Sequence, residues 1–132
     1  MIALRHVSKN YAPNFAALKD ISFEIDKGEV AFVAGPSGAG KSTLLKLLFR
    51  EEEASAGEIF INGADVTRLG SRGVARLRRQ IGLVFQDFKL LAKLTVVENV
   101  ALAAEVLGVS KNESRIKAYQ LLRELGLKER VE

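Results

Sequence analysis

The sequence predicts an α/β fold, with an antiparallel β portion near its start and a helical unit at its end. Three observations predict this class. The continuous apolar run VAFVA at 30–34 precedes a glycine-rich loop and a helical pattern, which is the order of the first half of a βαβ unit. Alternating apolar residues before and after this unit predict half-buried strands. From residue 95 onward only helical patterns occur.

The predicted strands have alternating or continuous apolar residues, and they lie at 2–7, 18–25, 30–34, 57–66 and 81–86. The first is marked by Ile2, Leu4 and Val7. The turn at 26–28 is expected to end the second strand, and Asn62-Gly63 is a typical hairpin turn within the fourth. The run at 30–34 is apolar throughout and the run at 81–86 is apolar up to Gln86, which is typical of parallel strands covered on both faces.

The predicted helices begin and end at recognisable residues. The first follows the glycine loop, and its buried stripe is expected to be Leu44, Leu45, Leu47 and Leu48. A short basic helix is predicted at 71–80. Thr95-x-x-Glu98 and Ser110-x-x-Glu113 are capping-box patterns that open two further helices, and Gly108 and Gly126 are expected to end them. We therefore predict a core over 1–86 and the start of a helical subdomain over 87–132.

Composition excludes several classes of site. The 132 residues are 48% apolar, which suits one compact domain or a large part of a bigger one. There is no cysteine, so disulfides and thiolate chemistry are excluded, and the single His6 excludes a site with several histidines. No stretch has the length and hydropathy of a membrane helix or a secretion signal. We expect a cytoplasmic chain whose membrane association would need a partner.

The segment AGPSGAGKST at 34–43 carries the most specific chemical signal. Gly35-x-x-x-x-Gly40-Lys41-Ser42 matches the phosphate-binding loop pattern. Glycines let successive backbone N–H groups converge on phosphate oxygens, and the following helix directs its positive end toward the same anion. Lys41 would contact the β- and γ-phosphates, and the Ser42 hydroxyl would bind Mg²⁺. The alternative is a glycine-rich turn that matches by chance.

Longer stretches resemble one family. GPSGAGKSTLLKLL, SAGEIFINGADVTRL and LRRQIGLVFQDFKLLAKLTVVENVALAAEVLG, in this order, resemble the N-terminal part of an ABC-type ATPase domain with a P-loop NTPase core. The similarity is greatest to FtsE-type cell-division ATPases, which pair with the membrane subunit FtsX and regulate cell-wall hydrolysis. The resemblance implies ATP and Mg²⁺ as ligands, a homodimer that closes around two ATP molecules, and a position on the inner face of the cell membrane.

The resemblance also implies residue roles. Tyr11 would stack on the adenine ring, unless it only packs at the end of a strand. Gln86 would be the Q-loop glutamine, which binds Mg²⁺ and senses the γ-phosphate, unless it is an ordinary polar residue. The segment 87–98 would lie near the groove for the membrane subunit. The phosphate cradle would comprise Gly35, Ser37, Gly38, Ala39, Gly40, Lys41, Ser42 and Thr43.

Other family parts have no match in the sequence. There is no LSGGQ signature, and LVFQD, whose Gln86 fills the Q-loop position, lacks the glutamate that follows the Walker B aspartate. We therefore expect a chain truncated before the signature and Walker B, one that binds ATP without efficient hydrolysis. Three functions stay open: the ATPase of an FtsE-type complex, a nucleotide-binding module without turnover, and the ATPase of a related exporter or lipoprotein-releasing system.

Two charged clusters are given simpler interpretations. Arg72, Arg76, Arg78 and Arg79 could contact nucleic acid or anionic lipid head groups. A solvated helix face is the more common meaning of such a run, and no interleaved aromatic residue supports base stacking. We therefore expect no nucleic-acid partner. The run Glu51-Glu52-Glu53 is interpreted as hydrated carboxylates with no catalytic role.

Overall fold

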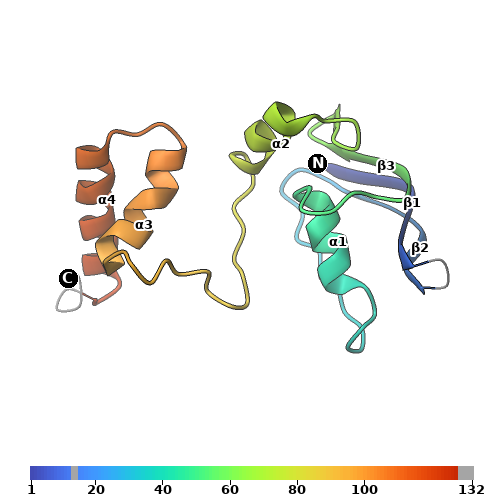
Figure 1. The fold of residues 1–132 in the computed structure, drawn as a ribbon, viewed down its shortest axis with the longest axis horizontal. Helices are drawn as coiled ribbons and strands as arrows, with labels where there is room; N and C mark the ends of the chain where they lie inside the picture. Colours follow the sequence, from blue (N-terminus) through green and yellow to red (C-terminus); the bar gives the residue numbers. More distant parts are fainter. Residues whose placement is uncertain (13–14, 128–132) are drawn as a thin grey trace. The chain divides into compact units, whose positions relative to one another are not determined.

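The computed structural model describes residues 1–12 and 15–127. The chain forms two compact units, Met1–Ile81 and a second that begins at Gly82. The first unit contains a sheet and the helices α1 and α2, and the second contains the helices α3 and α4 (Figure 1). No helix in the described ranges is long and apolar enough to cross a membrane.

The sheet of the first unit is antiparallel throughout. It comprises β1 (Ile2–Ala12), β2 (Phe15–Ile25), β3 (Ala56–Ile61) and β4 (Ala64–Asp65), in the spatial order β2-β1-β3-β4. β3 and β4 are joined by Asn62-Gly63, both of which have positive φ, as a tight hairpin turn requires. The predicted antiparallel portion and this hairpin are confirmed.

The two long strands contain facing bulges. Leu4 and Val7 are both buried although they are three residues apart, which simple alternation forbids. The register shifts between them, and His6 adopts φ 51. On β2 Asp20 has the same φ, and its carboxylate lies 2.8 Å from His6 Nδ1. One extra residue in each strand thus returns the apolar side chains to the core.

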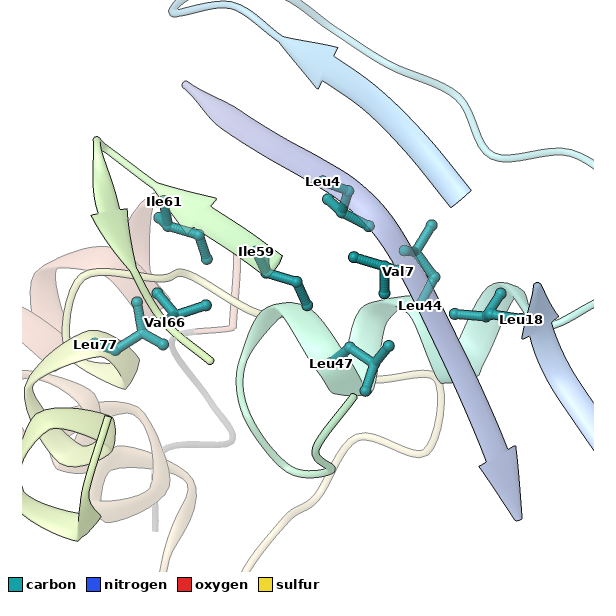
Figure 2. Packing of buried hydrophobic residues seen from close by; sticks show 9 residues of the cluster. All are labelled: Leu4, Val7, Leu18, Leu44, Leu47, Ile59, Ile61, Val66 and Leu77. Atoms are coloured by element: carbon teal, nitrogen blue, oxygen red, sulfur yellow. The ribbon is translucent and has the colours of Figure 1, made fainter. Parts of the chain in front are cut away.

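The core lies between this sheet and α1 (Lys41–Leu48). Figure 2 shows Leu44 and Leu47 of α1 in one cluster with Leu4 and Val7 of β1. The helix is confirmed, but its predicted stripe is only partly right, because Leu45 is half exposed. The buried members of this core come from all parts of the first unit and are Leu4, Val7, Leu18, Leu44, Leu47, Ile59, Ile61, Val66 and Leu77.

The predicted short basic helix is confirmed as α2 (Ser71–Arg78), which attaches to this core by Leu77. Arg78 also fixes it in place, since its guanidinium donates to the carbonyls of Phe49 and Arg50 at 3.0 and 2.8 Å. These carbonyls follow the end of α1, where cationic donors are favourable. Arg78 is therefore not part of a freely solvated face, which corrects the interpretation from sequence.

Two predicted strands are not formed. The segments 30–34 and 81–86 have no strand structure, and Phe32 and Val84 are 92% and 97% exposed. A parallel strand depends on ladder hydrogen bonds from neighbours on both sides. Neither segment pairs with another strand in the part of the chain that the structure describes. Apolar composition was thus insufficient to make a strand here.

The second unit is a helical hairpin. α3 (Val96–Val106) has a complete capping box between Thr95 and Glu98, and α4 (Lys111–Glu124) is capped by the Ser110 side chain. Gly108 and Gly126 end the two helices with positive φ and the paired hydrogen bonds of a Schellman motif. The helical unit is confirmed, and its own small core comprises Val97, Ala101, Ala118 and Leu122. The exact domain division at residue 86 stays a prediction.

Candidate functional site

The glycine loop joins the segment 30–34 to the first turn of α1. Gly40 is the N-cap of this helix and has φ 86, a left-handed conformation that side chains rarely adopt. Gly40 also lies directly against β2, because a Cβ atom there would be 2.5 Å from the Ala17 carbonyl oxygen and 2.8 Å from Leu18 Cδ2. The loop is therefore held close to the sheet at this one position.

The N-terminal end of α1 has no side-chain cap. Gly40 offers no side chain to its first N–H groups, and the first turn contains no acidic residue. The first four amides of a helix lack partners inside it, and together they carry partial positive charge. An end that is left open in this way, behind a glycine loop, fits an external anion such as a phosphate.

Lys41 reaches back over the same loop. Its ammonium donates to the carbonyl oxygens of Gly35 and Pro36, at 2.8 and 2.7 Å. The positive charge is thus held above the loop rather than directed into bulk water. Phosphate oxygens that bind to the amides of the loop would meet this ammonium, which can exchange its carbonyl contacts for charged ones.

Tyr11 contacts the first turn of α1. Its hydroxyl lies 3.2 Å from Thr43 Oγ1, which links the end of β1 to the helix. Its ring is half exposed, with the Phe15 ring 6.2 Å away at an interplanar angle of 30° and Lys9 Nζ 5.1 Å from its centroid. The structure thus brings Tyr11 and Thr43 together, and it adds two ring neighbours that the sequence did not indicate.

Glu52 is a further member of this cluster. It forms ion pairs with Lys46 at 3.1 Å and Lys9 at 3.4 Å, and its side chain is only 19% exposed. A hydrogen bond with the Tyr11 hydroxyl, together with the two ammonium groups, lowers the pKa of Glu52. The interpretation of Glu52 as a hydrated carboxylate was therefore wrong. A run of acidic residues does not indicate which of them will form ion pairs with residues distant in the sequence.

The two predicted magnesium ligands lie in different units. Ser42 is exposed in the first turn of α1, and Gln86 is exposed in a turn of the second unit. Within the described residues no group of three His, Cys, Asp or Glu side chains could hold a metal ion. A hydroxyl beside bound phosphates suits Mg²⁺, which takes oxygen ligands and is usually shared with the phosphate. The joint role of Ser42 and Gln86 stays a prediction.

A pocket lies between the loop and β2. It has a volume of about 420 Å³, and its walls include Phe23 and Ile25 of β2 together with Phe32 and Val33. Ala39, Gly40 and Lys41 of the loop also contribute to its lining. A mainly apolar lining does not suit a triphosphate, so we place the phosphate site at the open amides of α1 rather than here.

Comparison with known proteins yields consistent matches. A family model described as ABC transporter matches residues 18–132. The chain is 45% identical over 131 residues to the cell division ATP-binding protein FtsE of Bacillus subtilis, covering 99% of this chain and 58% of that protein. It is 47% identical over 127 residues to the FtsE of Escherichia coli strain K12, covering 96% and 57%.

Solved structures agree with these matches. A dimeric ATP-binding cassette, MJ0796, in a post-hydrolysis state bound to ADP and Pi, superposes with a TM-score of 0.87 at 34% identity, covering 99% of this chain and 60% of that one. The predicted fold class is confirmed. The chain spans about three fifths of the length of the relatives it matches.

Proposed function

Because this chain belongs to the ABC transporter family, we propose that it binds Mg-ATP through the loop 35–43. The observation that carries the proposal is the uncapped N-terminus of α1, which lies behind a glycine loop and beneath the Lys41 ammonium. These groups would together donate hydrogen bonds to a chain of phosphates. The relatives named as ATP-binding proteins support the choice of nucleotide.

The proposed roles follow from the positions of the residues. Backbone amides from Gly38 to Ser42 would bind the phosphate oxygens, and Lys41 would neutralise charge on the β- and γ-phosphates. Ser42 and Gln86 would each supply an oxygen to Mg²⁺. The half-exposed ring of Tyr11 would stack on adenine, because an aromatic face binds a flat base without reading its hydrogen-bond pattern.

For a protein that spans the full length of these relatives, we propose an ATPase that works with a membrane subunit. The FtsE relatives support a role in cell division, and the dimeric cassette supports closure of two ATP-binding domains around nucleotide. The partner would be an FtsX-like membrane protein that regulates cell-wall hydrolysis, which would keep the chain at the inner face of the membrane. For these 132 residues alone we propose binding without efficient turnover, since phosphoryl transfer needs positioning groups beyond the loop.

Thermal unfolding with and without Mg-ATP tests the binding proposal. A ligand at about one hundred times its Kd stabilises by about 2.7 kcal/mol, which corresponds to about 10 °C in a domain of this size. Lys41→Ala should remove most of this shift, because the charge contact with the β- and γ-phosphates is lost. Lys19→Ala, at an exposed position on β2, is the matched control and should retain it. An equal shift in wild type and Lys41→Ala would overturn the loop assignment.

A further inference from the structure

The basic residues of this chain are concentrated in one segment. Residues 66–86 contain five arginines and no acidic residue. The whole chain has a net charge of +4, so this segment carries +5 and the remainder sums to −1. An excess of this kind, confined to a short stretch, creates a local field that attracts anions.

Three of these arginines form a row along α2 and its C-cap residue, which keeps a helical backbone conformation. Arg72, Arg76 and Arg79 are spaced by four and three residues, so at 100° per residue they fall within an arc of about 60° and extend over about 10 Å. All three are exposed, and within the described ranges none of their side chains forms an ion pair or a hydrogen bond. Leu77, by which the helix is buried, projects from the other side. We call Arg72, Arg76 and Arg79 the arginine row.

The helix is held so that this row faces solvent. Arg78, the remaining arginine of α2, does not join the row but donates to the Phe49 and Arg50 carbonyls. Like charges at these spacings repel one another and disfavour the helix. A helix face that is only solvated does not need three positive charges in a row, and no carboxylate on the helix compensates them.

We propose that the arginine row binds the surface of an anionic phospholipid bilayer. Guanidinium groups pair with phosphates through two parallel hydrogen bonds, and a straight convex row meets a flat layer of head groups. The other exposed residues of α2 are Ser71, Ala75 and Arg78, so the helix presents no exposed aromatic or large aliphatic side chain beside the row. Protein interfaces need such anchors, and single-stranded nucleic acid needs aromatic rings for stacking. A charged lipid surface needs neither.

Vesicle flotation with the full chain tests this proposal. Each basic residue near an anionic bilayer strengthens partition about fivefold, so the whole row contributes about a hundredfold. The wild type should bind phosphatidylglycerol–phosphatidylcholine vesicles and not pure phosphatidylcholine, and added salt should weaken binding. The triple variant Arg72→Gln, Arg76→Gln, Arg79→Gln should lose this hundredfold, whereas the same three positions changed to Lys should retain most of it.

A second triple variant separates the row from net charge. Lys19→Gln, Lys27→Gln, Lys93→Gln removes the same charge at exposed positions elsewhere and should bind vesicles as the wild type does. An equal loss of vesicle binding in both triple Gln variants would overturn the proposal and show that binding depends only on net charge. If polyglutamate bound the wild type more tightly than the vesicles did, and this binding required the arginine row, the row would be assigned to an acidic protein instead. Equal binding to both vesicle types would exclude an anionic lipid surface as the ligand. The melting temperature without nucleotide should be the same in all variants, which shows that they fold and keeps this test separate from the nucleotide proposal.

Discussion

The absence of a Cβ atom at Gly40 is required both by the loop conformation and by the contact with the sheet. The residue has a left-handed backbone at the start of α1, and it touches the backbone of β2. Gly40→Ala should therefore add conformational strain and a steric clash, and lower the free energy of unfolding by about 3 kcal/mol. Urea unfolding, with the slope compared between variants, measures this loss.

Gly63 provides the matched control for Gly40. It has nearly the same φ, 81, but a Cβ atom there would meet nothing within 4 Å. Gly63→Ala should cost only the strain of the left-handed backbone, about 1 kcal/mol. If the two variants lost the same free energy, close approach of the loop to β2 would not contribute to stability.

For single residues, roles that depend on neighbouring residues in the sequence could be predicted, whereas contacts with distant residues could not. The glycines and Lys41 of the loop follow a fixed spacing, so one segment is enough to identify them. Glu52 pairs with Lys9 and with Tyr11, which lie about forty residues away on β1. Nothing in its own run distinguishes it from Glu51 or Glu53, because the distinction arises only when β1 meets α1.

Among the elements, α3 has a cap whose strength depends on pH. The backbone amide of Thr95 donates to the Glu98 carboxylate at 3.0 Å, and this bond is the main reason that the pKa of Glu98 is lowered from its ordinary 4.5. A carboxyl with a lowered folded pKa stabilises the fold fully above the unfolded pKa. This contribution is lost as the pH falls through the folded pKa.

Glu98→Gln should remove this pH dependence. Above pH 4.5 the wild type should unfold at a higher temperature than the variant, and the difference should shrink as the pH falls further, because the carboxyl is then protonated and resembles the amide. Helix melting followed by circular dichroism from acid to neutral pH checks this. Glu105→Gln, on the same helix, is the control and should show no comparable trend. A constant difference at all pH values would contradict the role of the charge.

The elements that were predicted correctly are those that contain their own determinants. The capping box of α3, the Ser110 cap of α4, where the predicted reciprocal bond from Glu113 does not form, and the terminal glycines of both helices lie within a few residues of the turns that they stabilise. The runs 30–34 and 81–86 need neighbouring strands for every ladder hydrogen bond, so their apolar residues indicate only a capacity for strand formation. The bulges at His6 and Asp20 were missed because apolar residues three positions apart, such as Leu4 and Val7, also occur in irregular segments.

Across the whole molecule, the exposed apolar segments should govern behaviour at high concentration. Phe32 is 92% exposed, and Val30 and Val33 beside it are also exposed. Contiguous apolar surface of this kind drives association, because water is released when two such surfaces meet. Sedimentation velocity over a concentration series should therefore show self-association that increases with added sulfate, which strengthens apolar burial.

Phe32→Ser should reduce this association without lowering the melting temperature, since the ring makes few contacts within the fold. The matched variant Phe60→Ser should instead destabilise the protein, because Phe60 lies in β3 with Arg5 over its ring. A wild type that stays monomeric at every concentration, or a Phe32→Ser variant that associates as strongly, would show that this surface is not what holds copies of the chain together.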